Sequence, residues 1–366
     1  MKIHLIAAAR PNFMKIAPLF HELNRNEGLE PVIVHTGQHY DLNMSDIFFQ
    51  DFNLPNPHIH LGVGSGTHAE QTGNVMIAYE KILMQSPPDL VVVVGDVNST
   101  VAATLAAVKL GIKTAHLEAG LRSFDRTMPE EINRLVTDSI ADYLWTPSPD
   151  GDENLLNEGV SEEKIVRVGN IMIDSFEMLR SEIEALDIFT KFNVRKREYG
   201  VVTLHRPSNV DSGQVLETLC RSLCKIAEQI PIIFPAHPRT LGRLEETGFK
   251  KLLSDSKYIN LVAPMGYKEF MNLVMNSRMI ITDSGGVQEE TTYLKIPCLT
   301  LRSNTERPIT VTEGSNQLCS SDTLLTHVHK LLQGKYKNSK IPELWDGKTA
   351  ERVVNCIKQI REGVGS

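Results

Sequence analysis

The chain has 366 residues, which is long for a single hydrophobic core and predicts about two domains. Hydrophobic residues make up 41% and charged residues 23%, an ordinary balance for a globular protein. The net charge of −7 excludes a general nucleic-acid or anionic-membrane surface. We therefore expect neither nucleic acid nor a membrane as a partner.

The first residues, MKIHLIAAARPNF, contain one short apolar run. This run is too short to span a bilayer and lacks the layout of a signal peptide, so it predicts a buried strand in a cytoplasmic protein. The five cysteines form no Cys-x-x-Cys pair, and the twelve histidines show no His-Glu-x-x-His spacing. We therefore expect reduced thiols and no structural metal.

Apolar runs of strand length alternate with helical patterns along the first half of the chain. The continuous apolar character of these runs is typical of parallel strands that are buried on both faces. The expected strands and helices, in order, are 2–9, helix 13–25, 31–37, helix 68–86, 89–96, helix 99–110 and 113–120.

The same scheme restarts after residue 170. The expected order is strand 200–207, helix 213–229, strands 231–239, 259–265 and 278–286, a helix, and strand 297–304. The pattern predicts an α/β protein of two Rossmann-like parallel-sheet domains, 1–170 and 171–349, facing each other across a cleft.

Reactive side chains follow nearly every predicted strand. Ligands bind beyond the carboxyl ends of parallel strands, so these residues predict a binding cleft in both halves. They are Arg10 and Lys15, Asp96, Glu118, His205 and Arg206, His237 and Arg239, Asp283 and Ser284, and Arg302 and Arg307.

The stretch TDSGGVQEETTYL (282–294) predicts an anion site at a helix N-terminus. Gly285 and Gly286 would let a phosphate approach the free backbone N–H groups. Glu290, about one turn further, could accept hydrogen bonds from a ribose diol, whereas Glu289 could simply complement the helix dipole. The alternative is an ordinary tight turn with an N-cap.

Other motifs are less informative. PEEINR (129–134) predicts a helix start, and a solvated pair of Glu130 with Arg134 explains it when it is taken alone. GVGSG (62–66) lacks the Gly-x-Gly-x-x-Gly layout, which argues against a nicotinamide dehydrogenase, and GKT (347–349) lacks the first glycine of a P-loop.

Taken together, the ordered motifs from residue 1 to about 320 resemble the non-hydrolysing UDP-N-acetylglucosamine 2-epimerase family. These motifs are ARPNFMKIAPL, HTGQHYD, GDVNST, HLEAGLRS, PEEINR, LHRPSNV, PAHPR, TDSGGVQEE and TERP. The resemblance implies a GT-B architecture, a homodimer and a C-terminal helix, 350–366, that joins the first domain. It also implies interconversion of UDP-GlcNAc and UDP-ManNAc through a glycal and bound UDP, with no cofactor.

The resemblance also implies roles for individual residues. The groups that transfer protons would be Asp96 and Glu118, as the principal acid/base pair, and Glu130 would share the proton transfer. His205 would stabilise the leaving phosphate or relay a proton. The remaining substrate contacts would come from Arg10, Lys15, Arg134, His237, Phe270 near the uracil, Ser284, Gly285 and Gly286 at the β-phosphate, Glu290 at the ribose, and Arg307.

The chain departs from the family pattern in the element that many bacterial members use for allosteric UDP-GlcNAc binding. Gln38 and His39 are present, but Asp41 stands where a longer polar or acidic residue is common. Allosteric activation by substrate is therefore not expected.

Three other functions fit parts of the pattern. A 2-epimerase of a UDP-2,3-diacetamido uronic acid would meet the extra carboxylate at Arg122, Arg126 or the 62–70 loop. A GT-B glycosyltransferase would transfer its sugar to an acceptor, which leaves three carboxylates unexplained. A silent nucleotide-sugar binder would be indifferent to substitution of Asp96 or Glu118.

Overall fold

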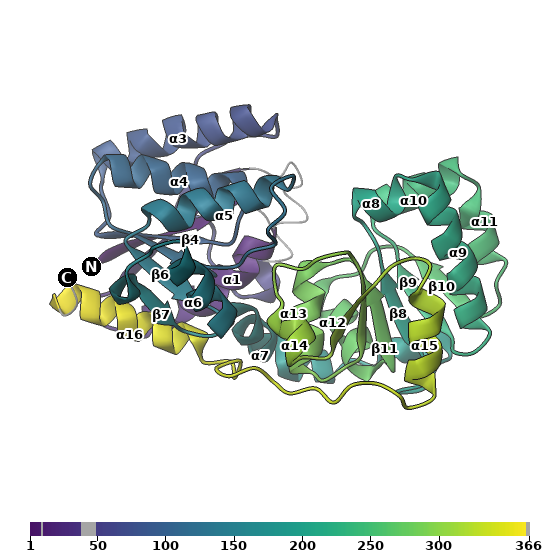
Figure 1. The fold of residues 1–366 in the computed structure, drawn as a ribbon. Helices are drawn as coiled ribbons and strands as arrows, with labels where there is room; N and C mark the ends of the chain where they lie inside the picture. Colours follow the sequence, from purple (N-terminus) through teal and green to yellow (C-terminus); the bar gives the residue numbers. More distant parts are fainter. Residues whose placement is uncertain (9, 38–48, 364–366) are drawn as a thin grey trace. The chain divides into compact units, whose positions relative to one another are not determined.

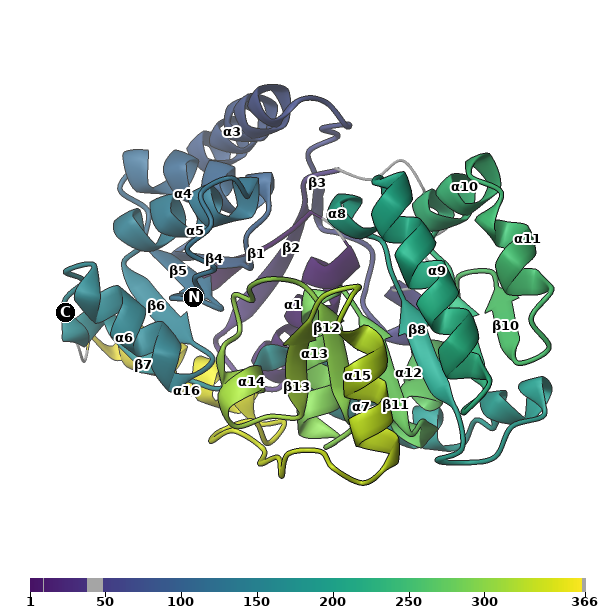
Figure 2. The same ribbon diagram turned by 45° about the vertical axis from the view of Figure 1, so that its right-hand side comes forward.

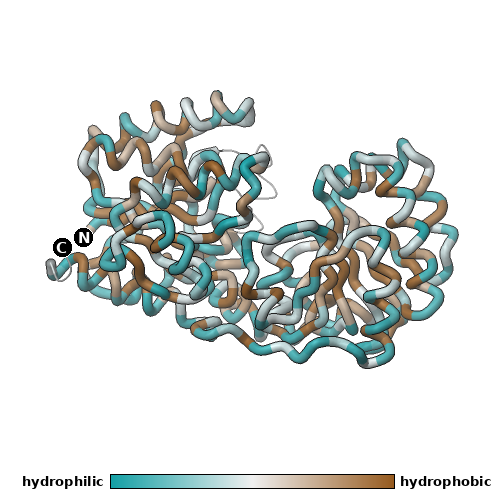
Figure 3. The backbone as a smooth tube through the Cα atoms, in the orientation of Figure 1, coloured by the Kyte–Doolittle hydropathy of each residue, from teal (hydrophilic) through white to brown (hydrophobic). Residues whose placement is uncertain are grey.

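The computed structural model describes residues 1–8, 10–37 and 49–363 of the chain (Figure 1). It divides into two compact units. The first unit consists of Met1–Leu179 together with Glu343–Ser366, and the second consists of Arg180–Pro342. Hydrophobic residues gather on the strands inside each unit and hydrophilic residues on the outer helix faces (Figure 3).

The described part of the first unit contains a sheet of seven parallel strands in the order β3-β2-β1-β4-β5-β6-β7. The strands are β1 (Lys2–Ala7), β2 (Glu30–His35), β3 (Ile59–His60), β4 (Leu90–Val94), β5 (Thr114–Leu117), β6 (Tyr143–Thr146) and β7 (Ile165–Arg167). Every residue of β4 and β5 is buried, as expected for central strands that helices cover on both faces.

Helices cover both faces of this sheet. α3, α4 and α5 pack side by side on one face, while α1 and α16 pack together on the other (Figure 1). The helices are α1 (Arg10–Asn24), α3 (His68–Gln85), α4 (Asn98–Lys109), α5 (Pro129–Ile140), α6 (Pro149–Asn157), the 3-10 turn η1 (Glu162–Lys164), α7 (Ile171–Glu184), which continues into the second unit, and α16 (Thr349–Glu362).

The second unit, which is described throughout, contains six parallel strands in the order β10-β9-β8-β11-β12-β13. The strands are β8 (Gly200–Thr203), β9 (Ile232–Pro235), β10 (Ile259–Val262), β11 (Met279–Thr282), β12 (Cys298–Leu301) and β13 (Asn316–Cys319). All of their pairings are parallel. This is the strand order of a dinucleotide-binding Rossmann domain.

The helices of the second unit lie on the two faces of its sheet. α9, α10 and α11 pack against one another beside β9 and β10 (Figure 2). The helices are η2 (Ile188–Phe192), α8 (Pro207–Val210), α9 (Gly213–Ala227), α10 (Pro238–Glu246), α11 (Phe249–Ser254), α12 (Tyr267–Asn276), α13 (Gly285–Tyr293), α14 (Ile309–Thr312) and α15 (Leu324–Leu332).

The strand order of each sheet reverses at one point. In the first unit this switch lies between β1 and β4, and in the second it lies between β8 and β11. Loops leave the sheet in opposite directions at such a point, which opens a crevice beyond the carboxyl ends of the two strands. The residues that follow β1, β4, β8 and β11 are therefore the first candidates for a site in each unit.

Candidate active site

Lys15 and Glu118 form a buried ion pair at the switch point of the first unit. The Lys15 ammonium in α1 contacts Oε2 of Glu118, which follows β5, and the two residues are 8% and 3% exposed. The backbone of Glu118 has a φ of +74°, a conformation that few residues other than glycine adopt. Such strain is typical of functional positions. Arg10 begins α1, but its side chain lies outside the described part of the chain, as do Gln38, His39 and Asp41.

Asp96, which follows β4, is held by Arg134 of α5. The Nη1 atom of Arg134 contacts Asp96 Oδ2, while Nη2 of the same guanidinium donates to Glu131 Oε2 at 2.6 Å. Arg134 is buried, whereas the Asp96 side chain keeps 31% of its surface exposed. Asp96 is therefore held by a basic partner and remains open to solvent.

Glu130 is exposed at the start of α5 and shares a pocket of about 210 Å³ with Asp96. The other residues that line this pocket are His68, Gln71, Val97, Asn98, Pro129 and Asn133. Asn98 Nδ2 donates to Gln71 Oε1 at 2.8 Å, and Asn133 Nδ2 donates to the Asp96 carbonyl at 2.9 Å. The pocket thus combines two carboxylates with a wall of amides, a composition suited to a polar ligand such as a sugar.

The buried face of α5 is charged, a feature that sequence reasoning missed. Glu131, Arg134 and Asp138 are spaced at i, i+3 and i+7, which places them on one face, and all three are buried. Glu131 accepts hydrogen bonds from the backbone N–H groups of Ser123 at 3.0 Å and Phe124 at 2.8 Å. That spacing was visible in PEEINRLVTDSI, but an amphipathic surface helix explains it equally well.

Asp138 lies within a buried cluster of charges. Its Oδ1 is 2.5 Å from His116 Nδ1, and its Oδ2 accepts a hydrogen bond of 2.7 Å from Arg122. Burial alone would raise the pKa of Asp138, but the charges and hydrogen bonds of His116 and Arg122 hold it below its usual value. Arg122 also forms a bidentate pair with Glu158, at 2.8 and 2.7 Å. The Arg122 guanidinium is thus fully engaged within the protein.

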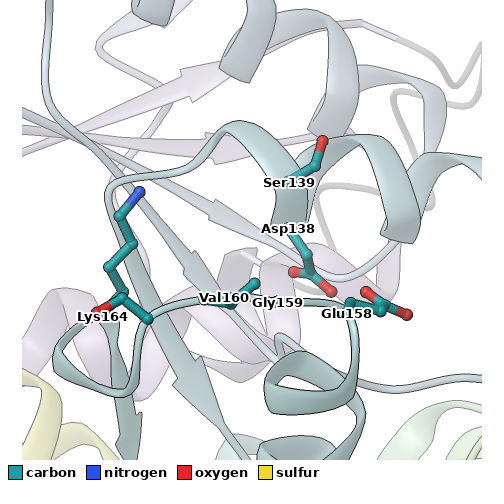
Figure 4. Close-up of a pocket in the computed structure, with 7 residues that line it drawn as sticks. Asp138, Ser139, Glu158, Gly159, Val160 and Lys164 are labelled. Carbon is teal, nitrogen blue, oxygen red and sulfur yellow. The ribbon is translucent and has the colours of Figure 1, made fainter.

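A second pocket, of about 360 Å³, lies beside this cluster (Figure 4). Asp138 and Glu158 are neighbours along its wall, and Lys164 lies away from them on the other side. Its remaining lining residues are Ser139, Gly159, Val160 and Ser161. None of the lining residues is a predicted catalytic group, so the pocket that contains Asp96 and Glu130 is the better candidate for chemistry.

His205 is positioned by Asp283 at the switch point of the second unit. Nδ1 of His205 is 2.9 Å from Asp283 Oδ1, and the same carboxylate accepts hydrogen bonds from the N–H of Arg206 at 2.9 Å and from Asn209 Nδ2 at 3.0 Å. Burial would raise the pKa of Asp283, but His205 and these donors keep it below its usual value. His237 is the N-cap residue of α10, and its ring lies 6.0 Å from that of His205.

The Ser-Gly-Gly sequence forms the start of α13, with Ser284 at the N-cap position and Gly285 as the first helical residue. A Cβ on Gly285 would come within 2.8 Å of Glu306 and 2.9 Å of Arg307, whereas a Cβ on Gly286 would have no described heavy atom within 4 Å. Gly285 therefore packs against the Arg307 side chain, and the open space lies beside Gly286. Open space at a helix N-terminus, where backbone N–H groups have no partner in the helix, favours an anion.

Arg307 is paired with two carboxylates. Its Nε lies 2.8 Å from Glu289 Oε1, and its Nη1 contacts Glu306. Glu289, for which the sequence suggested only a helix-dipole role, thus holds the side chain that reaches the first glycine of α13.

Glu290 is 4% exposed and accepts a hydrogen bond of 2.7 Å from the Tyr267 hydroxyl. Burial, with the nearby charge of Glu289, raises the pKa of Glu290 to about 8. Phe270 lies three residues after Tyr267 in α12 and is half-buried. Tyr267 was not predicted, because only the fold brings it to Glu290.

The predicted residues thus form two groups, one in each unit. Lys15, Asp96, Glu118, Glu130 and Arg134 lie in the first, and the others with described side chains lie in the second. Among the described residues, no three His, Cys, Asp or Glu side chains are arranged as metal ligands would be. Within the same ranges, no helix has both the length and the apolar character needed to cross a membrane.

Two Rossmann-like units with reactive groups at their switch points define a two-domain α/β enzyme of the GT-B type, which confirms the predicted fold class. The profile of the UDP-N-acetylglucosamine 2-epimerase family matches residues 21–358, and the chain belongs to this family. The resemblance drawn from the sequence motifs is therefore confirmed.

Similar proteins are known from archaea and bacteria. The UDP-N-acetylglucosamine 2-epimerase of Methanocaldococcus jannaschii is 44% identical over 363 residues, which cover 98% of this chain and 99% of that protein. A crystal structure of the M. jannaschii enzyme in complex with UDP-GlcNAc and UDP has a TM-score of 0.89, with 98% and 99% of the two chains covered. The UDP-2,3-diacetamido-2,3-dideoxy-D-glucuronate 2-epimerase of Pseudomonas aeruginosa is 39% identical over 322 residues, which cover 87% and 88%.

Proposed function

We propose that the chain interconverts UDP-GlcNAc and UDP-ManNAc by inverting the configuration at C2 of the sugar. A base removes the C2 proton while the C1–O bond breaks, and UDP leaves with the electron pair of that bond. The electrons of the C2–H bond form the C1=C2 bond of a glycal. Re-addition of UDP at C1, with a proton delivered to the other face of C2, completes the reaction.

One observation carries this proposal: Asp96 and Glu118 follow adjacent strands, β4 and β5, and each has a basic partner. Inversion requires proton-handling groups at two faces of one carbon, and neighbouring strand ends can supply them. In the proposed mechanism Asp96 and Glu118 are the principal acid and base, and Glu130 shares the proton transfer. Lys15 faces the pyrophosphate and offsets its charge.

The second unit supplies the proposed nucleotide site. The start of α13, Ser284 to Gly286, would hold the β-phosphate through its backbone N–H groups. Arg307, which Glu289 and Glu306 hold beside Gly285, would contact the phosphates or the uridine, and Glu290 would bind the ribose hydroxyls. His205, oriented by Asp283, would stabilise the departing phosphate or relay a proton, which lowers the barrier to C1–O cleavage.

The related reaction on a UDP-diacetamido uronic acid is the second candidate, and the P. aeruginosa relative bears the name of such an enzyme. Arg122 had been a possible anchor for the uronate carboxylate. Because its guanidinium is bound by Asp138 and Glu158, only Arg126 and the 62–70 loop remain for that role. Turnover of the two UDP-sugars in parallel separates the candidates, and we expect UDP-GlcNAc to be preferred.

NMR of UDP-GlcNAc with the enzyme in D₂O tests the reaction itself. We expect deuterium to enter C2 and UDP-ManNAc to accumulate without net hydrolysis. Retention of all protium at C2 during turnover would exclude elimination and re-addition. Transfer of the sugar to an added acceptor would instead indicate a glycosyltransferase.

We further propose that the enzyme is a homodimer, as the family resemblance implies, and that it is located in the cytoplasm, as the sequence of its first residues predicts. Sedimentation velocity at micromolar concentration should give a single species of twice the chain mass. A single species of chain mass would contradict the dimer.

A further inference from the structure

His116 lies at the centre of the buried charged cluster behind the proposed catalytic carboxylates. It belongs to β5 and has no exposed surface. Its Nε2 is 2.9 Å from the backbone carbonyl of Gly95, and its Nδ1 is 2.5 Å from Asp138 Oδ1. Each ring nitrogen therefore faces an oxygen.

The partners determine which atoms carry protons. A backbone carbonyl can only accept a hydrogen bond, so Nε2 donates to Gly95. Asp138 accepts at Oδ2 from the N–H of Gly120 at 3.0 Å and from Arg122 at 2.7 Å, and its Oδ1 forms the hydrogen bond with Nδ1. Both ring nitrogens of His116 are therefore held by hydrogen bonds. The cluster joins two basic residues, His116 and Arg122, to two acidic residues, Asp138 and Glu158.

The His116–Asp138 pair joins two loops that carry the proposed acid and base. Gly95, which accepts from Nε2, immediately precedes Asp96. Gly120, which donates to Asp138, is two residues after Glu118. The path from one loop to the other runs through four buried polar atoms, and it does not pass through either reactive carboxylate.

We propose that His116 and Asp138 are positioning residues that fix the separation of the Asp96 and Glu118 carboxylates. The proposal rests on the function proposed above, in which these groups act on one carbon atom. Misplacement of a reacting group by about 1 Å can lower a rate on the order of 100-fold. A buried ion pair that served stability alone would leave the rate of the folded enzyme unchanged.

Two substitutions of His116 separate its two hydrogen bonds. In His116→Gln the amide nitrogen can take the place of Nε2, so that the bond to Gly95 is kept and the bond to Asp138 is lost. In His116→Asn the amide nitrogen can take the place of Nδ1, so that the bond to Asp138 is kept and the bond to Gly95 is lost. Both variants replace the imidazole by an uncharged amide and lose one hydrogen bond, so their stabilities should fall by similar amounts.

Deuterium incorporation at C2 gives kcat and KM, and calorimetry gives the Kd for UDP and the Tm. Because each variant breaks one of the two hydrogen bonds that join the loops, we expect both to have a kcat about 10-fold below that of wild type, with a Kd for UDP within about 2-fold of wild type. Glu158→Gln is the matched control. It loosens Arg122 at the outer end of the cluster and should change kcat by less than about 2-fold.

A wild-type kcat in either folded His116 variant would overturn the proposal. Should either variant fail to fold, Asp138→Asn tests the Gly120 side of the link, and a folded Asp138→Asn with wild-type kcat would overturn it too. The wild-type enzyme distinguishes failure of the proposed function from failure of the positioning role. If wild type exchanges no deuterium at C2, both the proposed function and the positioning role are wrong. If wild type does exchange deuterium, the variants test the positioning role alone.

Discussion

The Asp283 carboxylate holds both the side chain and the backbone of His205. Its Oδ1 lies 2.9 Å from His205 Nδ1, and both of its oxygens lie 3.1 Å from the backbone N of His205. Asp283 has no exposed surface, whereas the His205 side chain is 41% exposed. The buried carboxylate thus fixes the ring from one side and presents Nε2 on the other. A carboxylate that orients an imidazole is a recurrent device in acid–base catalysis.

Asp283→Asn should lower kcat by about 100-fold or more, because the amide cannot hold the same tautomer and orientation of His205. Steady-state kinetics of C2 exchange measures the effect, and UDP titration should show a much smaller change. A double variant with His205→Ala should be no slower than His205→Ala alone. Additive losses would contradict the assigned relationship. Asp211→Asn, which breaks an exposed pair with Arg239, is the control.

Glu290→Gln should stabilise the protein and weaken UDP binding. The pKa of Glu290 is raised to about 8 in the folded chain, from an ordinary value of 4.5. The unfolded chain therefore binds fewer protons between these values, so wild-type stability falls as the pH rises through that range. Gln carries no ionisable group. Its advantage should be absent near pH 4, grow from pH 5 and level off above pH 8, with a Tm gain of roughly a few degrees.

Thermal unfolding across the pH range measures this advantage, and calorimetry should show an affinity for UDP that is about 10-fold lower. Glu245→Gln, at an exposed pair with Lys250, should change neither quantity. A Tm difference between Glu290→Gln and wild type that is independent of pH would show that Glu290 does not have a raised pKa.

Gly286→Ala should separate nucleotide binding from folding. No described heavy atom lies within 4 Å of the added methyl group, and alanine favours a helix, so the Tm should stay constant or rise. The methyl group would occupy the space through which a phosphate approaches the start of α13, and we expect the Kd for UDP to rise about 10-fold or more. Gly242→Ala in α10 also meets open space and should leave the Kd unchanged. Unaltered UDP binding by Gly286→Ala would place the phosphate elsewhere.

Lys15→Met should destabilise the first unit by about 3 kcal/mol, because it leaves the buried Glu118 carboxylate without its ammonium partner. The double variant Lys15→Met/Glu118→Gln should recover most of this loss, since neither charge of this buried pair remains. Urea unfolding gives the three free energies. Lys113→Met, at a surface pair with Asp142, should have little effect. A double variant less stable than Lys15→Met would show that the buried Glu118 charge is not the main cause of the loss of stability in Lys15→Met.

The positions of Asp96, Glu118, His205 and Ser284 could be predicted because each follows a run of apolar residues of strand length. Their location depends on local periodicity and on the rule that parallel strands end at one edge of a sheet. Glu130 and Glu131 could not be distinguished in this way. Which of the two neighbours is buried depends on the rotation of α5 against the sheet, and this follows from packing.

The sequence by itself determined the repeated β-α pattern, the two parallel sheets and the family, because these depend on residue order over short spans. Only the tertiary structure decided how the charges pair. His116 pairs with Asp138, which is 22 residues away in the sequence. Arg122 pairs with Glu158 at a separation of 36 residues, and His205 pairs with Asp283 at a separation of 78. A buried charge is stable only beside a partner of opposite sign, and the partner's identity depends on which strands and helices become neighbours when the chain folds.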